Sequence, residues 1–374
     1  MNGLWSHFWK EDWDRVRARH IAWWRREGLV LSVRAPASSR HSGGGASPAP
    51  TSTAGLDMDA ARGPEDLEAI YTDPVRRARI AEAALANTYF GGEAFPYFDT
   101  HIGPGSLALM LGSEPGFAVD TVWYKPCITD PDHHPPLRFD PENPWFLKQK
   151  ALLEEGMRVS QGRFLVGIPD LIENIDTLAS LRDTQTLMMD MIERPDFVKQ
   201  RVAEINQVYF AVFDRYFEIV KDPWGGNAFS AFAIWGPGKT AKVQCDASAM
   251  FSPKMFAEFV APALTEQCEW LDYSLYHLDG THCIPHLDVL LEIDALDAIE
   301  WTPQAGLPGG GDPMWFGLYR RILDAGKSVQ AVGVLPNEVI PLLDAVGAKG
   351  LFVMVSAETE SEARRLVEAV EAYR

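Results

Sequence analysis

The stretch that decides the fold is YHLDGTHCIPH, residues 276–286. It closes a strand predicted over residues 273–278 and leads into a helix predicted over residues 284–293. Side chains two residues apart on a strand point to the same face, so we expect His277 and Asp279 to lie together. Gly280 then allows the backbone to turn sharply. Polar residues that end a strand just before a turn and a helix are typical of the active-site end of an α/β barrel.

Strands and helices alternate along the rest of the chain. Short apolar runs predict further strands at residues 29–34, 164–168, 227–234, 240–245, 298–301, 328–332 and 350–355. Helical periodicity predicts helices at residues 11–26, 254–271 and 360–373, and over 184–221 with a break near 194–195. This alternation predicts an α/β protein, with a single (β/α)₈ TIM-type barrel domain over residues 1–374 and an N-terminal helical extension.

One segment departs from this alternation. Residues 36–55, PASSRHSGGGASPAPTSTAG, contain almost no large apolar side chains. Such a segment cannot offset the entropy lost on ordering, so we predict a disordered, flexible loop inserted into the domain. No GxGxxG or GxxxxGKS/T loop follows any predicted strand, and this disfavours nucleotide binding.

The composition limits the classes of function. The 374 residues are 47% hydrophobic and 23% charged, which is ordinary for a globular protein. No apolar run is long enough to span a bilayer and no export signal begins the chain, so we expect a cytoplasmic protein without a membrane partner. The net charge of −18 disfavours binding of nucleic acid or of a polyanionic small molecule, and we expect a small-molecule substrate of another kind. The four cysteines are widely spaced and are expected to be free thiols.

The decisive stretch offers candidate metal ligands. Imidazole, carboxylate and thiolate groups all bind Zn²⁺, and a catalytic zinc keeps three protein ligands and an open position. The candidates are His277, Asp279, Cys283 and His286. The alternative is a hydrogen-bonded pair of His277 and Asp279 at the strand end, with Cys283 packed as a small apolar side chain.

Other polar strand ends supply candidate catalytic and binding residues. Asp170 and Glu173 follow the strand at 164–168 and are candidate acids or bases, whereas Asp176 is expected to be a cap or solvated. Asp246 ends a strand whose side chains alternate in polarity, and Asp99 lies in a turn-rich segment. Capping and turn roles are the alternatives for both. Two further candidates for substrate contact are His101 and Asn174.

Aromatic residues near the strand ends are candidates for a platform beneath a flat substrate. The chain has 12 Trp. The candidates are Trp123, Tyr124, Trp235 and Trp301, together with Gln304. Filling of the core is the alternative for each aromatic side chain.

From about residue 60 to the end, the order of segments resembles the uroporphyrinogen decarboxylase superfamily. The likeness is best over residues 177–195, 252–256 and 277–301, where His-x-x-Gly precedes a short helix and then Asp297-Ala298-Ile299. The resemblance implies a distorted (β/α)₈ barrel. Its methyltransferase branch uses zinc and cobalamin to act on coenzyme M.

The site residues match this family only in part. In the methyltransferase branch, a His-x-Cys-Gly motif binds zinc. His277 matches the histidine, but Asp279 replaces the cysteine, and residues 355–357, where a late cysteine would fall, contain none. The resemblance therefore implies at most a zinc site with an altered, harder set of ligands. The arginine pair of the decarboxylase branch is also missing, since Arg34 is followed by Ala35-Pro36, and this argues against uroporphyrinogen as substrate.

Three functions remain open. The first is a metal-assisted methyltransferase that works with a separate corrinoid protein, because this chain has no Asp-x-His-x-x-Gly cobalamin motif of its own. The second is a lyase or decarboxylase that uses acid–base catalysis on a small polar or sugar-like substrate. The third is a non-catalytic corrinoid- or ligand-binding protein. The resemblance favours the first function, whereas the replacement at Asp279 favours divergence.

Overall fold

The structure is a computed structural model that describes residues 5, 7–38, 64–119 and 121–374. Of the loop predicted over residues 36–55, residues 39–55 lie outside this described part. Within it, no helix combines the length and the apolar character needed to cross a membrane.

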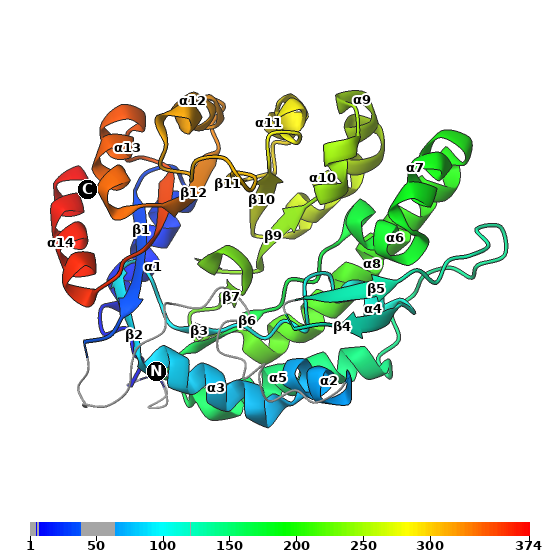
Figure 1. The fold of residues 1–374 in the computed structure, drawn as a ribbon, viewed down its shortest axis with the longest axis horizontal. Coiled ribbons are helices and arrows are strands. Elements are labelled where there is room, and N and C mark those ends of the chain that lie inside the picture. The colour runs from blue at the N-terminus through cyan, green and yellow to red at the C-terminus, as the bar shows by residue number, and fades with distance from the viewer. Residues whose placement is uncertain (1–4, 6, 39–63, 120) are drawn as a thin grey trace.

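The central feature is a seven-stranded sheet with the order β2-β1-β13-β12-β11-β10-β9 (Figure 1). All neighbours are parallel except β2, which runs antiparallel to β1. The strands are β1 (Val30–Pro36), β2 (Thr88–Gly92), β9 (Thr240–Gln244), β10 (Tyr273–Asp279), β11 (Ala298–Thr302), β12 (Ser328–Val334) and β13 (Leu351–Ser356). The α/β class with a parallel central sheet is therefore confirmed.

Two smaller sheets complete the set of strands. A four-stranded sheet has the order β3-β6-β7-β8, and β4 pairs with β5 in an antiparallel ribbon. Their bounds are β3 (Tyr97–Phe98), β6 (Leu165–Ile168), β7 (Asn227–Phe229), β8 (Ile234–Gly236), β4 (Glu114–Phe117) and β5 (Val122–Lys125). The single strand predicted over residues 227–234 is thus wrong, because the chain turns back after β7 and β8 runs antiparallel to it.

A side chain joins the two larger sheets where no backbone ladder pairs β7 with β9. The buried amide of Asn227 donates to the carbonyl of Thr240 at 3.0 Å and accepts from its N–H at 2.9 Å. The Asn227 side chain thus makes the two hydrogen bonds to the backbone of Thr240 that a neighbouring strand would otherwise make. The ladders of the described residues thus form separate sheets, and the closed eight-stranded ring stays a prediction.

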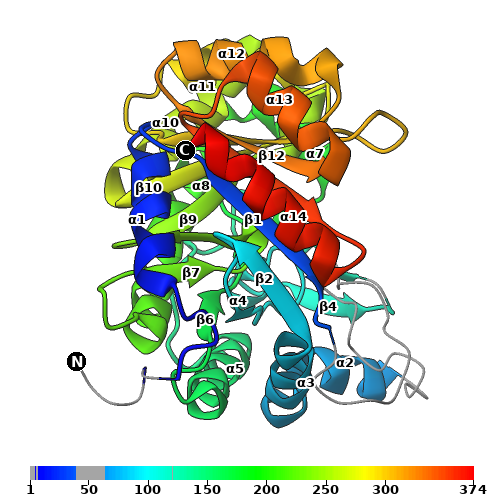
Figure 2. The same ribbon diagram turned by 90° about the vertical axis from the view of Figure 1, so that its left-hand side faces the viewer.

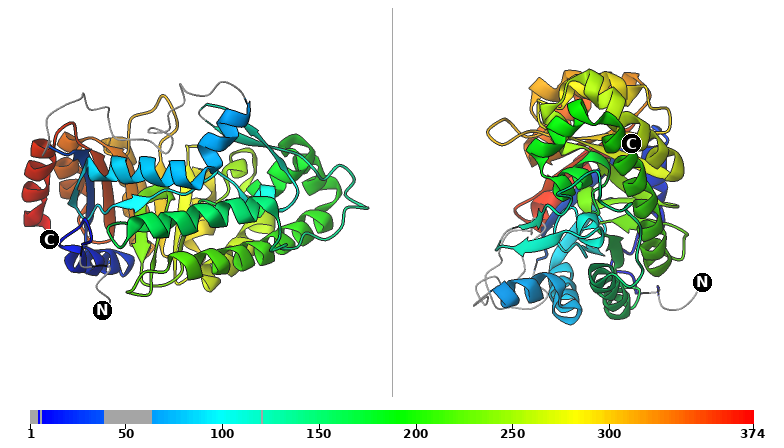
Figure 3. Two further views of the ribbon diagram at one scale, coloured as in Figure 1. Left: turned by 90° about the horizontal axis from the view of Figure 1, so that it is seen from below. Right: turned by 90° about the vertical axis from the view of Figure 1, so that its right-hand side faces the viewer.

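Helices cover the outer faces of the sheets. The helices α3, α5 and α8 lie side by side over the four-stranded sheet, and α14 runs alongside β1 (Figures 2 and 3). The predicted break near residue 194 is confirmed, since α7 ends at Glu193 and α8 begins at Pro195. The helices are α1 (Trp13–Trp24), α2 (Pro64–Thr72), α3 (Pro74–Ala86), α4 (Leu107–Met110), α5 (Pro144–Ser160), α6 (Asn174–Arg182), α7 (Thr184–Glu193), α8 (Pro195–Val220), α9 (Pro253–Met255), α10 (Ala261–Trp270), α11 (Leu287–Leu291), α12 (Phe316–Asp324), α13 (Val339–Val346) and α14 (Glu360–Val370).

The predicted N-terminal helix, α1, packs against the amino-terminal ends of the strands. The indole N–H of Trp23 donates to the carbonyl of Gly350, just before β13, at 3.1 Å. The indole N–H of Trp24 donates to the carbonyl of Trp235 at 2.9 Å. Both indoles are almost fully buried. Because α1 covers this end, the carboxyl ends of the strands remain for a functional site.

Candidate functional site

Three possible metal ligands meet at the carboxyl ends of β9 and β10. Asp246, His277 and Asp279 each offer a ligand atom, and these atoms all lie within 4.8 Å of one another. The parallel register pairs His277 with Gln244, so Asp246, two residues past the end of β9, comes beside Asp279 at the end of β10. His277 and Asp279 therefore meet as the period of the strand predicts, and Asp246, a catalytic candidate from the sequence, joins them.

A buried carboxylate on the next strand orients the imidazole. The register places Glu300 of β11 beside His277, and the imidazole Nδ1 forms a hydrogen bond with its carboxylate. Glu300 is fully buried and also accepts from the Thr302 hydroxyl at 2.7 Å. Burial alone would lower the pKa of His277, but the carboxylate of Glu300 outweighs it and raises that pKa. The other ring nitrogen, Nε2, faces Asp246 with 4.0 Å between Nε2 and Oδ1.

Asp246 is held through both its side chain and its backbone. The amide of Gln244 donates to its Oδ2 at 2.8 Å, and Asp176 accepts from the backbone N–H of Asp246 at 2.7 Å. Partial burial and then the nearby Asp176 carboxylate raise the pKa of Asp246 to about 6. Excess negative charge at this point favours a cation, because a cation would relieve the repulsion between the carboxylates.

A second polar group lies beside the first. The buried ammonium of Lys242 forms an ion pair with Asp170 at 2.7 Å and a hydrogen bond with the side chain of Gln244. Glu173 accepts from the backbone N–H of Gln244 at 2.8 Å. Burial raises the pKa of Glu173 to about 8, although Lys242 opposes the shift. One oxygen of Glu173 and one of Asp170 are buried without a hydrogen-bond partner among the described residues.

Asp99 and His101 form a separate pair. The carboxylate of Asp99 lies 2.7 Å from Nδ1 of His101. Burial would raise the pKa of Asp99, but His101 and the nearby Arg77 outweigh it and lower the pKa to about 2. The guanidinium of Arg77 donates to the backbone carbonyls of both residues, so this turn is held rigidly. Asp99 is not among the grouped metal ligands.

The structure does not bring Cys283 and His286 to the grouped ligands. The thiol of Cys283 lies 3.6 Å from the hydroxyl of Ser248. Nε2 of His286 donates to the backbone carbonyl of Ser248 at 2.8 Å, and the ring stacks on Phe256 with 4.6 Å between centroids. Both side chains are buried because the chain turns after Gly280 and packs them against the segment that follows β9.

The aromatic platform is wrong for two of its members. Trp235 and Trp301 are 0% exposed, so neither ring offers a face to a substrate. The indole of Trp235 donates to Asp222 at 2.6 Å, and Trp301 packs against Trp315. The physical reason is packing: Trp301 lies on β11 inside the seven-stranded sheet, and Trp235 on β8 packs edge-on against Trp13 of α1, so both rings fill the core.

The remaining sequence candidates lie at three different places. Trp123 is 52% exposed on the β4–β5 ribbon, where the neighbouring Tyr124 donates to the Pro104 carbonyl at 2.6 Å. Gln304 accepts from the Thr281 hydroxyl at 2.6 Å, beside the turn at Gly280. Asn174 begins α6, where its buried amide donates to the Val260 carbonyl at 3.3 Å.

Sequence reasoning missed Lys242, Gln244 and Glu300 as members of the site. A signal was present, because residues 242, 244 and 246 alternate with Val243 and Cys245 along β9 and just past its end. Glu300 and Thr302 likewise share one face of β11. Alternation alone could not say that this face points inward, toward the grouped ligands.

Comparison with known proteins bears on the fold. No model of a known protein family matches the sequence, and no curated protein does. Among solved structures there is a match.

The chain shares its fold with a methyltransferase. That protein, from Methanosarcina mazei, aligns with a TM-score of 0.58 over 96% of this chain and 99% of its own, at 13% sequence identity. So low an identity shows a common fold and no more, and the chemistry has to be argued from the site.

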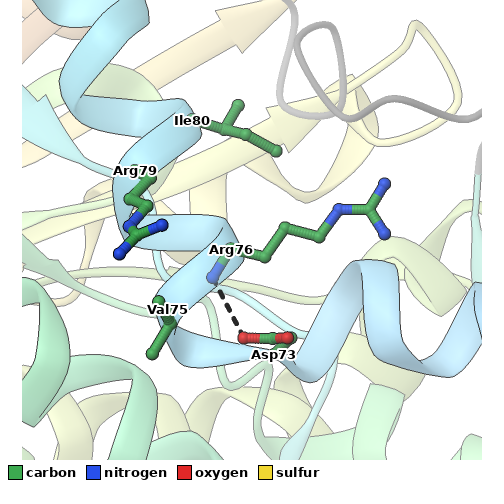
Figure 4. A pocket seen from close by; sticks show the side chains of 5 residues that line it. All are labelled: Asp73, Val75, Arg76, Arg79 and Ile80. Atoms are coloured by element: carbon green, nitrogen blue, oxygen red, sulfur yellow. Dashed lines mark hydrogen bonds between the residues drawn. The ribbon is translucent and has the colours of Figure 1, made fainter.

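A surface hollow of about 510 Å³ lies elsewhere, at the start of α3 (Figure 4). Its lining residues are Asp73, Val75, Arg76, Arg79 and Ile80. Asp73 caps the helix by accepting from the backbone N–H of Arg76 at 3.0 Å. None of these residues belongs to the grouped ligands, so this hollow is not part of the candidate site.

Proposed function

We propose that this chain is a metal-assisted methyltransferase that binds a small-molecule acceptor and receives the methyl group from a separate corrinoid protein. The observation that carries the proposal is the buried Glu300 carboxylate behind His277. Histidines that bind a metal through one ring nitrogen commonly donate a hydrogen bond from the N–H of the other to a carboxylate, as here. The fold shared with a methyltransferase supports the same proposal and agrees with closure of the sheets into a distorted barrel.

The donor set fits a divalent metal ion. One imidazole nitrogen and two carboxylates, from His277, Asp246 and Asp279, make three protein ligands of types that Zn²⁺ accepts. The two carboxylates make the site harder than a thiolate site, so Mn²⁺ or Fe²⁺ are competitors of Zn²⁺. Cys283 and His286 are not needed as ligands.

When bound, the metal would act as a Lewis acid that lowers the pKa of the acceptor. The chain's own residues hold the ligands for it. Glu300 fixes the imidazole of His277 so that Nε2 faces the carboxylates. Gln244 and the backbone contacts to Asp176 fix Asp246. Ligands held in place before binding lose little entropy when the metal or the acceptor binds.

The test is the metal content of the purified protein. We expect one equivalent of divalent metal per chain, which is lost on His277→Ala, Asp246→Asn and Asp279→Asn. Asp99→Asn is the matched control, because it removes a carboxylate outside the grouped ligands. If the protein binds none of Zn²⁺, Mn²⁺ and Fe²⁺, the proposal is overturned.

Methyl transfer is the second readout. Methylcobalamin serves as the methyl donor and coenzyme M as the thiol acceptor. We expect demethylation of the cobalamin, seen as a change in its absorption, to depend on the metal and to be lost in the three ligand variants. If the protein binds metal but transfers a methyl group to no acceptor, the methyltransferase part of the proposal is overturned and the metal site remains.

The pair of Glu173 and Asp170 favours a second candidate, a lyase or decarboxylase that acts on a small polar or sugar-like compound. At neutral pH Glu173 holds its proton, since its pKa is about 8, while Asp170 is paired with Lys242. One protonated and one ionised carboxyl group can serve as acid and base. Turnover that survives a chelator but is lost in Glu173→Gln would favour this candidate over methyl transfer.

A further inference from the structure

The turn between β7 and β8, residues 230–233, has an unusual backbone. Phe232 has φ 59° and ψ 10°, and Ala233 has φ 52°. Both lie in the left-handed region of backbone conformation, which residues other than glycine rarely adopt. Two consecutive residues of this kind persist only where their surroundings impose the conformation, and such places cluster at functional sites.

Hydrogen bonds from three strands hold this turn. The N–H of Ser230 donates to the carbonyl of Ile168 on β6 at 2.9 Å, and the hydroxyl of Tyr97 on β3 donates to the carbonyl of Ser230 at 2.9 Å. The side chain of Gln330 on β12 donates to the carbonyl of Phe232 at 2.8 Å. Since β3 and β6 belong to one sheet and β12 to the other, the turn crosses the space between the two sheets.

This conformation places the ring of Phe232 against His277. The two ring centroids are 4.8 Å apart with an angle of 37° between the planes. This separation and angle place the ring of Phe232 over a face of the imidazole, while Glu300 holds its Nδ1 edge. Phe232 is itself only partly buried, so the residue keeps some contact with solvent.

We propose that Phe232 determines specificity, as a wall that limits the size of the group that fits beside His277. This inference rests on the proposed function for one point, the identity of the ligand, which is a small aliphatic acceptor with its reactive atom near Nε2 of His277. An acceptor with a phenyl group next to the reactive atom is excluded, because the ring of Phe232 already fills that space. The strained turn serves to hold the wall in place.

The first experiment measures thiol binding to protein loaded with Co²⁺, through the absorption band of the cobalt–thiolate bond. We expect 2-mercaptoethanol to bind the parent protein at least tenfold more tightly than benzyl mercaptan. In Phe232→Ala this preference should fall at least tenfold, because the vacated space admits the phenyl ring. Phe210→Ala, which truncates a ring stacked on Trp270 in α10, is the matched control and should keep the parent's preference.

The second experiment needs neither metal nor methyl transfer. Toluene is added to metal-free Phe232→Ala, in which it should fill the space beside His277 and shift the NMR signals of that imidazole; in the parent it should not. If toluene binds to Phe232→Ala but no cobalt–thiolate band appears, the role of Phe232 in limiting ligand size is supported and the proposed metal-dependent function is overturned. If Phe232→Ala neither binds toluene nor changes the thiol preference, the wall itself is overturned. Phe232→Leu, which preserves apolar volume, should behave like the parent and shows that the turn still folds.

Discussion

The substitution Glu300→Gln tests the central feature of the site, the carboxylate behind His277. Glu300 is fully buried, and its two partners are Nδ1 of His277 and the Thr302 hydroxyl, the latter at 2.7 Å. A glutamine keeps the shape. Its carbonyl oxygen can still accept from Nδ1–H, and its NH₂ can donate to the hydroxyl. The fold should therefore survive, and only the negative charge is lost.

The loss of that charge should weaken metal binding. Removing a partner behind a metal-binding histidine typically costs about 10–100-fold in metal affinity. This corresponds to about 1.4–2.8 kcal/mol of binding free energy. The effect arises because a neutral partner no longer raises the basicity of the imidazole, whose pKa the carboxylate of Glu300 raises in the parent.

The assay is a competitive Zn²⁺ titration against a chromophoric chelator, with thermal unfolding of the metal-free protein as a check on the fold. Glu93→Gln is the matched control, because Glu93 is another fully buried carboxylate, paired with Arg374 far along the chain from the site. It should alter stability and leave the metal affinity unchanged. Equal zinc affinities of the parent and Glu300→Gln would refute the reasoning, as would an equal loss in the control.

Three further predictions concern stability. In Asn227→Leu the two backbone groups of Thr240 lose their partners, and two buried unsatisfied groups should cost about 2–5 kcal/mol in chemical denaturation. Burial lowers the pKa of His20 from 6.5 to about 4, so the unfolded chain binds the proton more readily. The free energy of unfolding should therefore fall by about 3 kcal/mol as the pH drops from 6.5 to 4. His20→Phe should remove this slope from the pH dependence of unfolding. Gly280→Ala places a Cβ at φ 74° and should cost about 1–2 kcal/mol of unfolding free energy.

Each of these predictions has its own control. Asn87→Leu removes an amide that bonds one carbonyl near the surface and should cost far less than Asn227→Leu. His133→Gln removes an imidazole that is 84% exposed and should leave the acid slope in place. Gly317→Ala, in helix α12 with open space around the new Cβ, should stabilise the protein. Equal effects in a variant and its control would contradict the corresponding argument.

The sequence could predict those features that depend on local periodicity. A strand has a period of two, so the joint position of His277 and Asp279 followed from their spacing alone. The alternation of strands and helices gave the α/β class, and Pro195 marked the start of α8, because proline is well suited to the first turn of a helix.

Other features of the site could not be predicted because they depend on register and burial. The register of β10 with β11 brings Glu300, 23 residues away in the chain, to Nδ1 of His277. The register with β9 brings Asp246 to the same point. Polar alternation marks both segments in the sequence, but it does not say that either residue meets His277. The sequence likewise offered Trp235 and Trp301 as binding surfaces, and only their packing shows that they are core residues.

By itself, then, the sequence determined the kind of fold and the strand end at which to look, because hydrogen bonding and side-chain direction within one strand or helix are local. Only the tertiary structure decided which groups surround that strand end. It placed Glu300 behind His277, Asp246 beside it, and Phe232 over its face. These neighbours come from three different segments of the chain, and contacts between such segments are set by the packing of the whole domain, which no local pattern encodes.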